Sequence, residues 1–277
     1  MQAHHFTVDV EEYFQVSAFE GQVPRERWRT LESRVCASVR LLLEMLAHHH
    51  VCGTFFVLGW VADHCPDLVR EIARERHEIA SHGWDHKRVT SLRPEEFRAS
   101  VRRTKRSLED LTGTEVAGFR APSYSIVPGF EWAFDVLIEE GYRYDSSLYP
   151  VRRPGGYGYP GTVPHPHWIH RKGGKLAEFP PATLRRFGMS IPAGGGAYFR
   201  ILPYALTQSA LRDCERRGEP ATFYVHPWEV DPAQPRFDVP WLTRLRHYTG
   251  LRGTEQRLHR LLREFRFARI ADTAVAM

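Results

Sequence analysis

Short apolar segments alternate with longer amphipathic segments through the first 150 residues, and this alternation constrains the fold more than any other feature. Segments 5–10 and 53–58 are short and rich in aromatic and β-branched residues, which is typical of buried strands. Helical periodicity follows them, as in 34–49 and 94–111. Strands separated by helices of ten or more residues pair in parallel, because the crossover connection needs about that length. We therefore predict an α/β fold, either a (β/α) barrel or a long open sheet.

The pattern changes after residue 150. Residues 151–175 are rich in Gly, Pro and aromatic side chains and predict a long ordered surface loop. Its tyrosines and Trp168 suit either a plain connection or a surface that faces carbohydrate. Beyond it the sequence predicts strands and helices again, with a helix break near Thr249 and Gly250, over the ranges 176–179, 202–217, 221–225 and 239–265.

Composition excludes several classes of protein. The 38 basic residues are opposed by 33 acidic ones and are scattered, which favours solvated helix faces over a nucleic-acid footprint. No run of about 18 apolar residues is present, so no membrane span is expected. Four cysteines without C-x-x-C spacing indicate reduced thiols. Because the N-terminal segment lacks the pattern of a signal peptide, we expect a cytoplasmic protein.

Polar or ionisable residues stand where several predicted strands end. Asp9 and Glu11 follow the first strand and His82 follows the third, and three later strands are followed in the same way by Arg120, Asp145 and His226. In a (β/α) barrel these strand ends share one face, on which catalytic groups gather. The sequence therefore predicts an active site on that face.

The segment S-H-G-W-D-H places two imidazoles, His82 and His86, at positions i and i+4. On a helical turn they would lie on one face and could share a metal ion, and a carboxylate from a neighbouring strand would complete the site. Asp9 and Glu11 point to the same side of a strand, whereas Glu12 points away. One carboxylate would bind the metal and the other would take a proton from a water that the metal acidifies. An acidic strand end facing solvent is the alternative.

Three further residues have functional interpretations. Arg120 could hold the Asp9 carboxylate through a bidentate pair, the alternative being a structural ion pair at the surface. The backbone amide of Ser123, which directly follows Pro122 in a predicted turn, could point at an oxyanion. His226 ends a strand where it could protonate a leaving amine, and we expect Asp145 to hold that imidazole as a cation.

The segments that carry these residues resemble, in order, the five motifs of the polysaccharide deacetylase family (carbohydrate esterase family 4, NodB homology). They are T-V-D-V-E, S-H-G-W-D-H, R-A-P-S-Y, Y-D-S-S and V-H-P, and the match covers roughly residues 4–230. We assign residues 1–230 to the barrel and residues 231–277 to a C-terminal helical extension packed on it. The remainder resembles the subgroup found with bacterial exopolysaccharide and exosortase loci.

This resemblance implies a distorted (β/α)7 barrel of the TIM-like type and hydrolysis of N-acetyl groups on amino sugars of a bacterial polysaccharide or its precursor. It also implies a divalent metal, zinc by default with cobalt and nickel as alternatives. By position, Asp9 is the general base, Arg120 orients it, His226 is the general acid, and His82 and His86 bind the metal. We expect the remaining contacts to substrate or oxyanion from Ser123, Tyr124 and Trp228.

One position departs from the commonest family pattern, which has two adjacent aspartates. Here the second position is Val10, which cannot bind metal. The D-x-E spacing resembles a minority variant whose ligand lies two residues on, so Glu11 is preferred over Glu12 as the third ligand. That variant also includes enzymes acting on small cyclic amides, so an allantoinase-like hydrolase is an alternative function. A catalytically inactive glycan-binding module is another.

Overall fold

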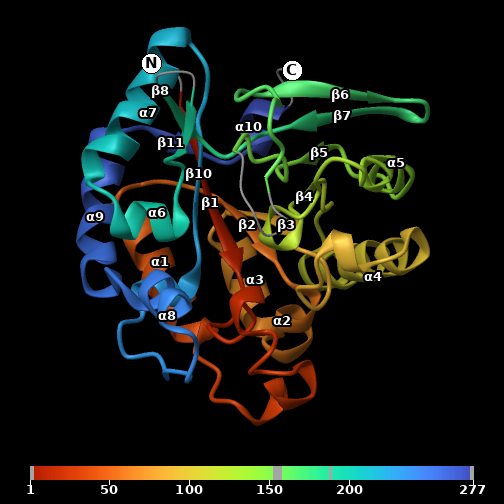
Figure 1. The fold of residues 1–277 in the computed structure, drawn as a ribbon. Coiled ribbons are helices and arrows are strands. Elements are labelled where there is room, and N and C mark those ends of the chain that lie inside the picture. Colours follow the sequence, from red (N-terminus) through yellow and green to blue (C-terminus); the bar gives the residue numbers. More distant parts are fainter. Residues whose placement is uncertain (1–2, 152–157, 187–188, 275–277) are drawn as a thin grey trace.

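A ring of parallel strands organises the computed structural model, which describes residues 3–151, 158–186 and 189–274 (Figure 1). Neighbouring strands pair in the order β10-β1-β2-β3-β4-β5-β7, all in parallel. The chain after β7 returns to β10, where Pro181 bridges Thr222 and Gly195 bridges Tyr224. These bridges close the barrel between its first and last strands. The strands are β1 (His4–Val10), β2 (Thr54–Val57), β3 (Glu78–Ser81), β4 (Gly118–Phe119), β5 (Tyr144–Asp145), β7 (Gly174–Glu178) and β10 (Thr222–Val225).

Strand alternation separates the outer core from the barrel interior. Phe6, Val8 and Val10 of β1 pack in the large apolar cluster with the α1 residues Val39 and Leu42. The alternate residues of β1 therefore face inward, where Thr7 and Asp9 bond the guanidinium of Arg120. The polar residues at the end of this strand consequently lie at the mouth of the barrel.

Helices surround the ring, with α4 (Pro94–Thr112) and α5 (Trp132–Glu139) on one side and α7 (Tyr204–Arg217) and α9 (Leu251–Glu264) on the opposite side (Figure 1). Local sequence explains their ends: α4 begins at Pro94 and ends before Gly113, whose φ of 68° is left-handed. Two short helices, α2 (Gly59–His64) and α3 (Pro66–Arg74), meet at Cys65, and Pro66 begins the second. The helices around the strands are α1 (Val35–His48), α2 (Gly59–His64), α3 (Pro66–Arg74), α4 (Pro94–Thr112), α5 (Trp132–Glu139) and α7 (Tyr204–Arg217). Short 3-10 turns occupy Ser17–Phe19, Arg25–Thr30, Val89–Ser91, Pro122–Tyr124 and Pro227–Val230.

The second half of the chain carries elements that the sequence did not predict. Part of the predicted loop 151–175 is strand β6 (His167–Arg171), which forms an antiparallel hairpin with β7 across a turn at Lys172 and Gly173. A second hairpin and a short helix follow β7, namely β8 (Thr183–Arg186), β9 (Met189–Pro192) and α6 (Gly196–Ile201). Residues 152–157 of the predicted loop lie outside the described residues.

The C-terminal helical segment matches its prediction, including the break. It consists of α8 (Trp241–Tyr248) and α9 (Leu251–Glu264), separated at Gly250 with a φ of 82°. Strand β11 (Phe267–Ala268) then pairs with the beginning of β1, and α10 (Ala271–Ala274) follows. Within the described ranges, no helix is both long enough and apolar enough to cross a membrane.

Candidate metal centre and active-site pocket

Three potential metal ligands converge at the mouth of the barrel. Glu11 follows β1, and His82 and His86 follow β3, the strand two positions along the ring. One ligand atom from each lies within 4.8 Å of the others. All three side chains are buried, so their polar atoms are shielded from bulk water.

The polar atoms of this group are suited to a divalent cation. The Nδ1–H of His82 donates to the backbone oxygen of Arg120 at 2.8 Å, which leaves its Nε2 free as a ligand atom. Burial lowers the pKa of His82 to about 4, so this imidazole is neutral, the form that binds metal. The Oε2 of Glu11 lies 2.8 Å from His86 Nε2, yet this oxygen and His86 Nδ1 are buried without a hydrogen-bond partner among the described residues. Burial alone would raise the pKa of Glu11, but His86 and two further imidazoles lower it to about 2.

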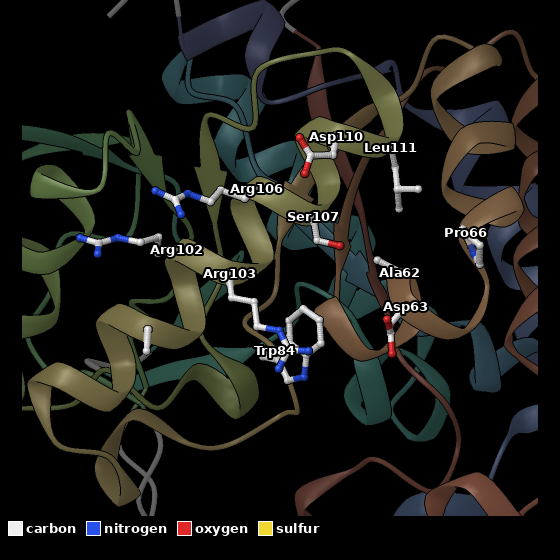
Figure 2. Close-up of a pocket in the computed structure, with 11 residues that line it drawn as sticks. Ala62, Asp63, Pro66, Trp84, Arg102, Arg103, Arg106, Ser107, Asp110 and Leu111 are labelled. Atoms are coloured by element: carbon white, nitrogen blue, oxygen red, sulfur yellow. The ribbon is translucent and has the colours of Figure 1, made fainter.

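The two histidines converge through an irregular loop, so the expected helical turn is wrong. Gly83 has a φ of 74° and His86 a φ of 56°, both left-handed. Trp84 lies between the histidines in sequence and packs on the outer side, where the guanidinium carbon of Arg103 lies 3.3 Å from the centroid of its ring. Figure 2 shows this pair in a shallow outer pocket beside α4. A Cβ at Gly59 would lie 2.2 Å from the Trp84 ring, so the glycine is required for this packing.

Arg120 holds Asp9 through one nitrogen. Its Nη1 donates to Asp9 Oδ1 at 2.6 Å and to Thr7 Oγ1 at 2.8 Å. The expected bidentate pair is wrong because the other side of the guanidinium donates to the backbone oxygen and the hydroxyl of Ser146. The Arg120 side chain is fully buried, so this ion pair does not lie at the protein surface.

The partner of His226 is Glu229, which corrects the expectation of Asp145. His226 Nδ1 donates to Glu229 Oε2 at 3.0 Å, and its Nε2 lies 3.8 Å from both Asp9 Oδ2 and Glu11 Oε1. Asp145 instead accepts from Ser147 Oγ at 2.6 Å. Glu229 reaches the imidazole because the 3-10 turn after Pro227 folds its carboxylate back onto His226, where it also accepts the His226 backbone N–H.

A buried arginine that the sequence did not suggest completes this arrangement. Arg200 Nε donates to Glu229 Oε1 at 2.5 Å, and the guanidinium also donates to the backbone oxygens of Arg246, His247 and Thr249. Although burial opposes ionisation, Arg200 and His226 lower the pKa of Glu229 to about 2. Burial likewise opposes the charge on His226, but Glu229 and the nearby carboxylates raise its pKa to about 9. The imidazole is therefore a cation at neutral pH.

Trp228 holds a potential metal ligand in place. Its Nε1–H donates to Glu11 Oε1 at 3.0 Å, and its ring stacks between His226 and His247, with centroids 4.9 and 4.2 Å away. It was expected to contact substrate, and it does line the pocket. Its indole N–H, however, donates to Glu11 and is therefore not available to a substrate.

Ser123 and Tyr124 lie on the wall of the same pocket. Both have left-handed backbones, with φ of 55° and 51°. Ser123 Oγ lies 2.8 Å from Ser17 Oγ. The buried hydroxyl of Tyr124 has no hydrogen-bond partner within the part of the chain that the structure describes.

The pocket that contains these groups has a volume of about 460 Å³. Asp9, the three potential ligands and His226 line its inner part. Its rim is formed by residues of other elements, among them Arg88, Tyr198, Leu242 and Arg246. Two carboxylates, an imidazolium and a three-ligand cluster in one pocket can polarise a carbonyl, activate a water and protonate a leaving group.

Comparison with known protein families agrees with this geometry. Residues 34–129 match the family model described as polysaccharide deacetylase, and residues 146–275 match a domain of unknown function (DUF3473). The chain is 27% identical over 139 residues to a peptidoglycan N-acetylglucosamine deacetylase of Listeria monocytogenes. That alignment covers 47% of this chain and 29% of the relative, so the chain spans less than a third of that protein.

Solved structures share the fold. A Mycobacterium smegmatis protein assigned to the polysaccharide deacetylases superposes with a TM-score of 0.66 at 22% identity, over 99% of this chain and 89% of that one. The allantoinase PuuE superposes with a TM-score of 0.65 at 17% identity and the same coverage. The prediction of a (β/α)7-type barrel is thereby confirmed.

Proposed function

We propose that this chain, which belongs to the polysaccharide deacetylase family, is a metal-dependent hydrolase that removes N-acetyl groups from amino sugars of a bacterial polysaccharide or its precursor. The observation that carries the proposal is the convergence of Glu11, His82 and His86 beside Asp9 and the protonated His226 in one pocket. Two acids and three histidines at strand ends match what hydrolysis of an amide requires.

The donor set of Glu11, His82 and His86 fits a divalent cation, and zinc is the ion we propose. The buried Glu11 Oε2, which faces His86 Nε2, and the Nε2 of His82 support this assignment. When bound, such a cation polarises a carbonyl and lowers the pKa of water.

Asp9 is the proposed general base. Arg120 occupies its Oδ1, which fixes the carboxylate and leaves Oδ2 on the side of His226, 3.8 Å from Nε2. From that position Oδ2 takes the proton of the attacking water. Arg120 keeps the carboxylate oriented, because its buried guanidinium donates a hydrogen bond to Oδ1.

His226 is the proposed general acid. Its Nδ1–H is held by Glu229, so the Nε2–H that faces the pocket is the proton delivered to the leaving amine. Glu229 stabilises the imidazolium before that transfer. We assign the oxyanion contact to the backbone at Ser123, and a substrate contact to the unpartnered hydroxyl of Tyr124.

The substrate class rests on the sequence relatives. The Listeria relative is named for N-acetylglucosamine of peptidoglycan, which favours acetamido sugars over small cyclic amides. The shared fold does not separate these classes, since an allantoinase has it too. We also propose that residues 1–230 form the barrel and that 231–277 is an extension packed on it, an arrangement in keeping with the pairing of β11 with β1.

Metal analysis combined with acetate release tests this function. Glu11→Ala and His86→Ala should lose the bound metal and release no acetate from N-acetylated oligosaccharides, and Asp9→Asn should keep the metal but lose turnover. Asp85→Asn is the matched control, because this carboxylate lies in the same loop but pairs with Arg25 and Lys87. Stoichiometric metal in both ligand variants would refute the proposed centre, and full turnover by Asp9→Asn would refute the base.

A further inference from the structure

Helix α8 presents large apolar side chains to solvent. Trp241 is 70% exposed, Leu242 60% and Leu245 53%, and Ile201 at the end of the neighbouring α6 is 41% exposed. Trp241 and Leu245 are four residues apart and therefore share one side of the helix. We call these four side chains the α8 face. A contiguous exposed apolar patch on a folded protein marks an interaction surface.

The α8 face adjoins the mouth of the active-site pocket. Leu242, Thr243 and Arg246 of the same helix line that pocket. The last turn of α8 is buried at His247 and Tyr248, and its last carbonyls accept hydrogen bonds from Arg200. Because Arg200 belongs to α6, these hydrogen bonds hold the end of α8 against α6, and Figure 1 shows the two helices side by side.

Exposed arginines lie within α8 and on either side of it in the sequence. Between residues 236 and 252 the chain has four exposed arginines and a single acidic residue, Asp238; the arginines are Arg236, Arg244, Arg246 and Arg252. A tryptophan and leucines together with arginines characterise helices that lie at the surface of an anionic membrane, where the apolar side chains enter the acyl boundary and the cations meet headgroups.

We propose that the α8 face docks on an anionic membrane surface and so places the pocket mouth against the bilayer. This goes beyond the proposed reaction, because docking requires no catalysis. A second copy of the chain fits less well, since a two-fold contact would bring the arginines of both copies together. A sugar-binding platform accounts for Trp241 but not for Leu245 and Ile201, whose side chains cannot bond hydroxyl groups.

Vesicle flotation of the full-length, metal-loaded protein tests the docking. We expect binding to phosphatidylcholine vesicles that contain phosphatidylglycerol, and weak binding to phosphatidylcholine alone. The double variant Trp241→Gln/Leu245→Gln should reduce the partition coefficient by at least about 10-fold, given the apolar area removed. Arg244→Gln should reduce it roughly 5-fold, since one arginine near such a surface contributes about a factor of five. Met189→Gln is the matched control, as Met189 is 62% exposed on the β8–β9 hairpin.

Three results would overturn the docking. The first is the absence of wild-type binding to anionic vesicles, and the second is binding that the double variant leaves unchanged while its circular dichroism shows a native fold. The third is a wild-type dimer in light scattering that the double variant dissociates, which would assign the face to self-association. In the second case, a double variant that also loses turnover on a soluble oligosaccharide would assign the face to the glycan. Because binding is measured without substrate, failure of the deacetylase proposal leaves this test unaffected.

Discussion

Replacing Glu229 by glutamine should destabilise the protein strongly, because the substitution leaves a buried positive charge without its counter-ion. Glu229 is 1% exposed and accepts from Arg200 Nε at 2.5 Å and from His226 Nδ1 at 3.0 Å. Glutamine preserves the shape but removes the charge that both cations face. Removing one partner of a buried ion pair costs about 3–5 kcal/mol. At roughly 2–4 °C per kcal/mol for a chain near this size, the melting temperature should fall by about 6–20 °C.

A double-mutant cycle separates this pair from its surroundings. Arg200→Met should cost more than Glu229→Gln, because it also deprives three backbone oxygens at the end of α8 of their donor. The double variant should cost less than the sum of the single variants, since neither charge is then left alone. Glu71→Gln is the control: its carboxylate binds Arg40 through two nitrogens but at the surface, so its loss should cost under about 1 kcal/mol.

The measurement is the free energy of unfolding in urea at neutral pH, with metal in excess. The sign of the pH dependence provides a second check. Because the pKa of Glu229 is lowered to about 2, its contribution is complete above the ordinary value of 4.5 and is lost as the pH falls towards 2. The difference between wild type and Glu229→Gln should therefore shrink over that interval. A cost equal to the surface control, or strict additivity in the cycle, would refute the reasoning.

Two further predictions concern the barrel interior and the ligand loop. His5 is fully buried against Thr222 and Thr273, and burial lowers its pKa to about 3, so its contribution is complete above pH 6.5 and decreases towards pH 3. When the pH is lowered from 7 to 5, the free energy of unfolding of His5→Gln should therefore fall by about 2 kcal/mol less than that of wild type. Urea unfolding at the two pH values measures this difference, and an equal fall in both proteins would contradict the prediction. Gly59→Ala should displace Trp84, lowering stability by about 1–3 kcal/mol and reducing metal content in elemental analysis, whereas Gly21→Ala, with open space around it, should change neither. Unaltered metal content in Gly59→Ala would show that the loop does not depend on this packing.

Local periodicity explains what could be predicted from the sequence. Strand alternation is a property of consecutive residues, so it correctly placed Asp9 and Glu11 on the inner side of β1 and directed Glu12 away, where it accepts from Ser33 and the Arg34 amide. The strand ends also converge as expected, because parallel strands in one ring terminate on the same face.

The errors arise where the backbone departs from regular structure or where a contact spans many residues. The i, i+4 spacing of His82 and His86 suggested a helical turn. The loop instead contains a left-handed φ at His86, which is rare for a residue with a side chain and could not be expected from the spacing. The H-P-W-E spacing of His226 and Glu229 is a capping-box pattern and could have identified the partner of His226. Arg200 gave no local signal, because its partner lies 29 residues away and its helix α6 is short.

The contacts of Arg200 bear on how the two matched regions of the chain cooperate. The region that matches the polysaccharide deacetylase model, 34–129, contains His82, His86 and Arg120, whereas His226 and Glu229 lie in the region 146–275 that matches the other model. Strand β1, which precedes both, carries Asp9 and pairs with β2 and β10, one from each region. One guanidinium in the second region binds both Glu229 and the last carbonyls of α8. Arg200 therefore supports both the proposed general acid and helix α8. A surface that fixes α8 acts on a helix bonded to the same arginine as the Glu229–His226 pair.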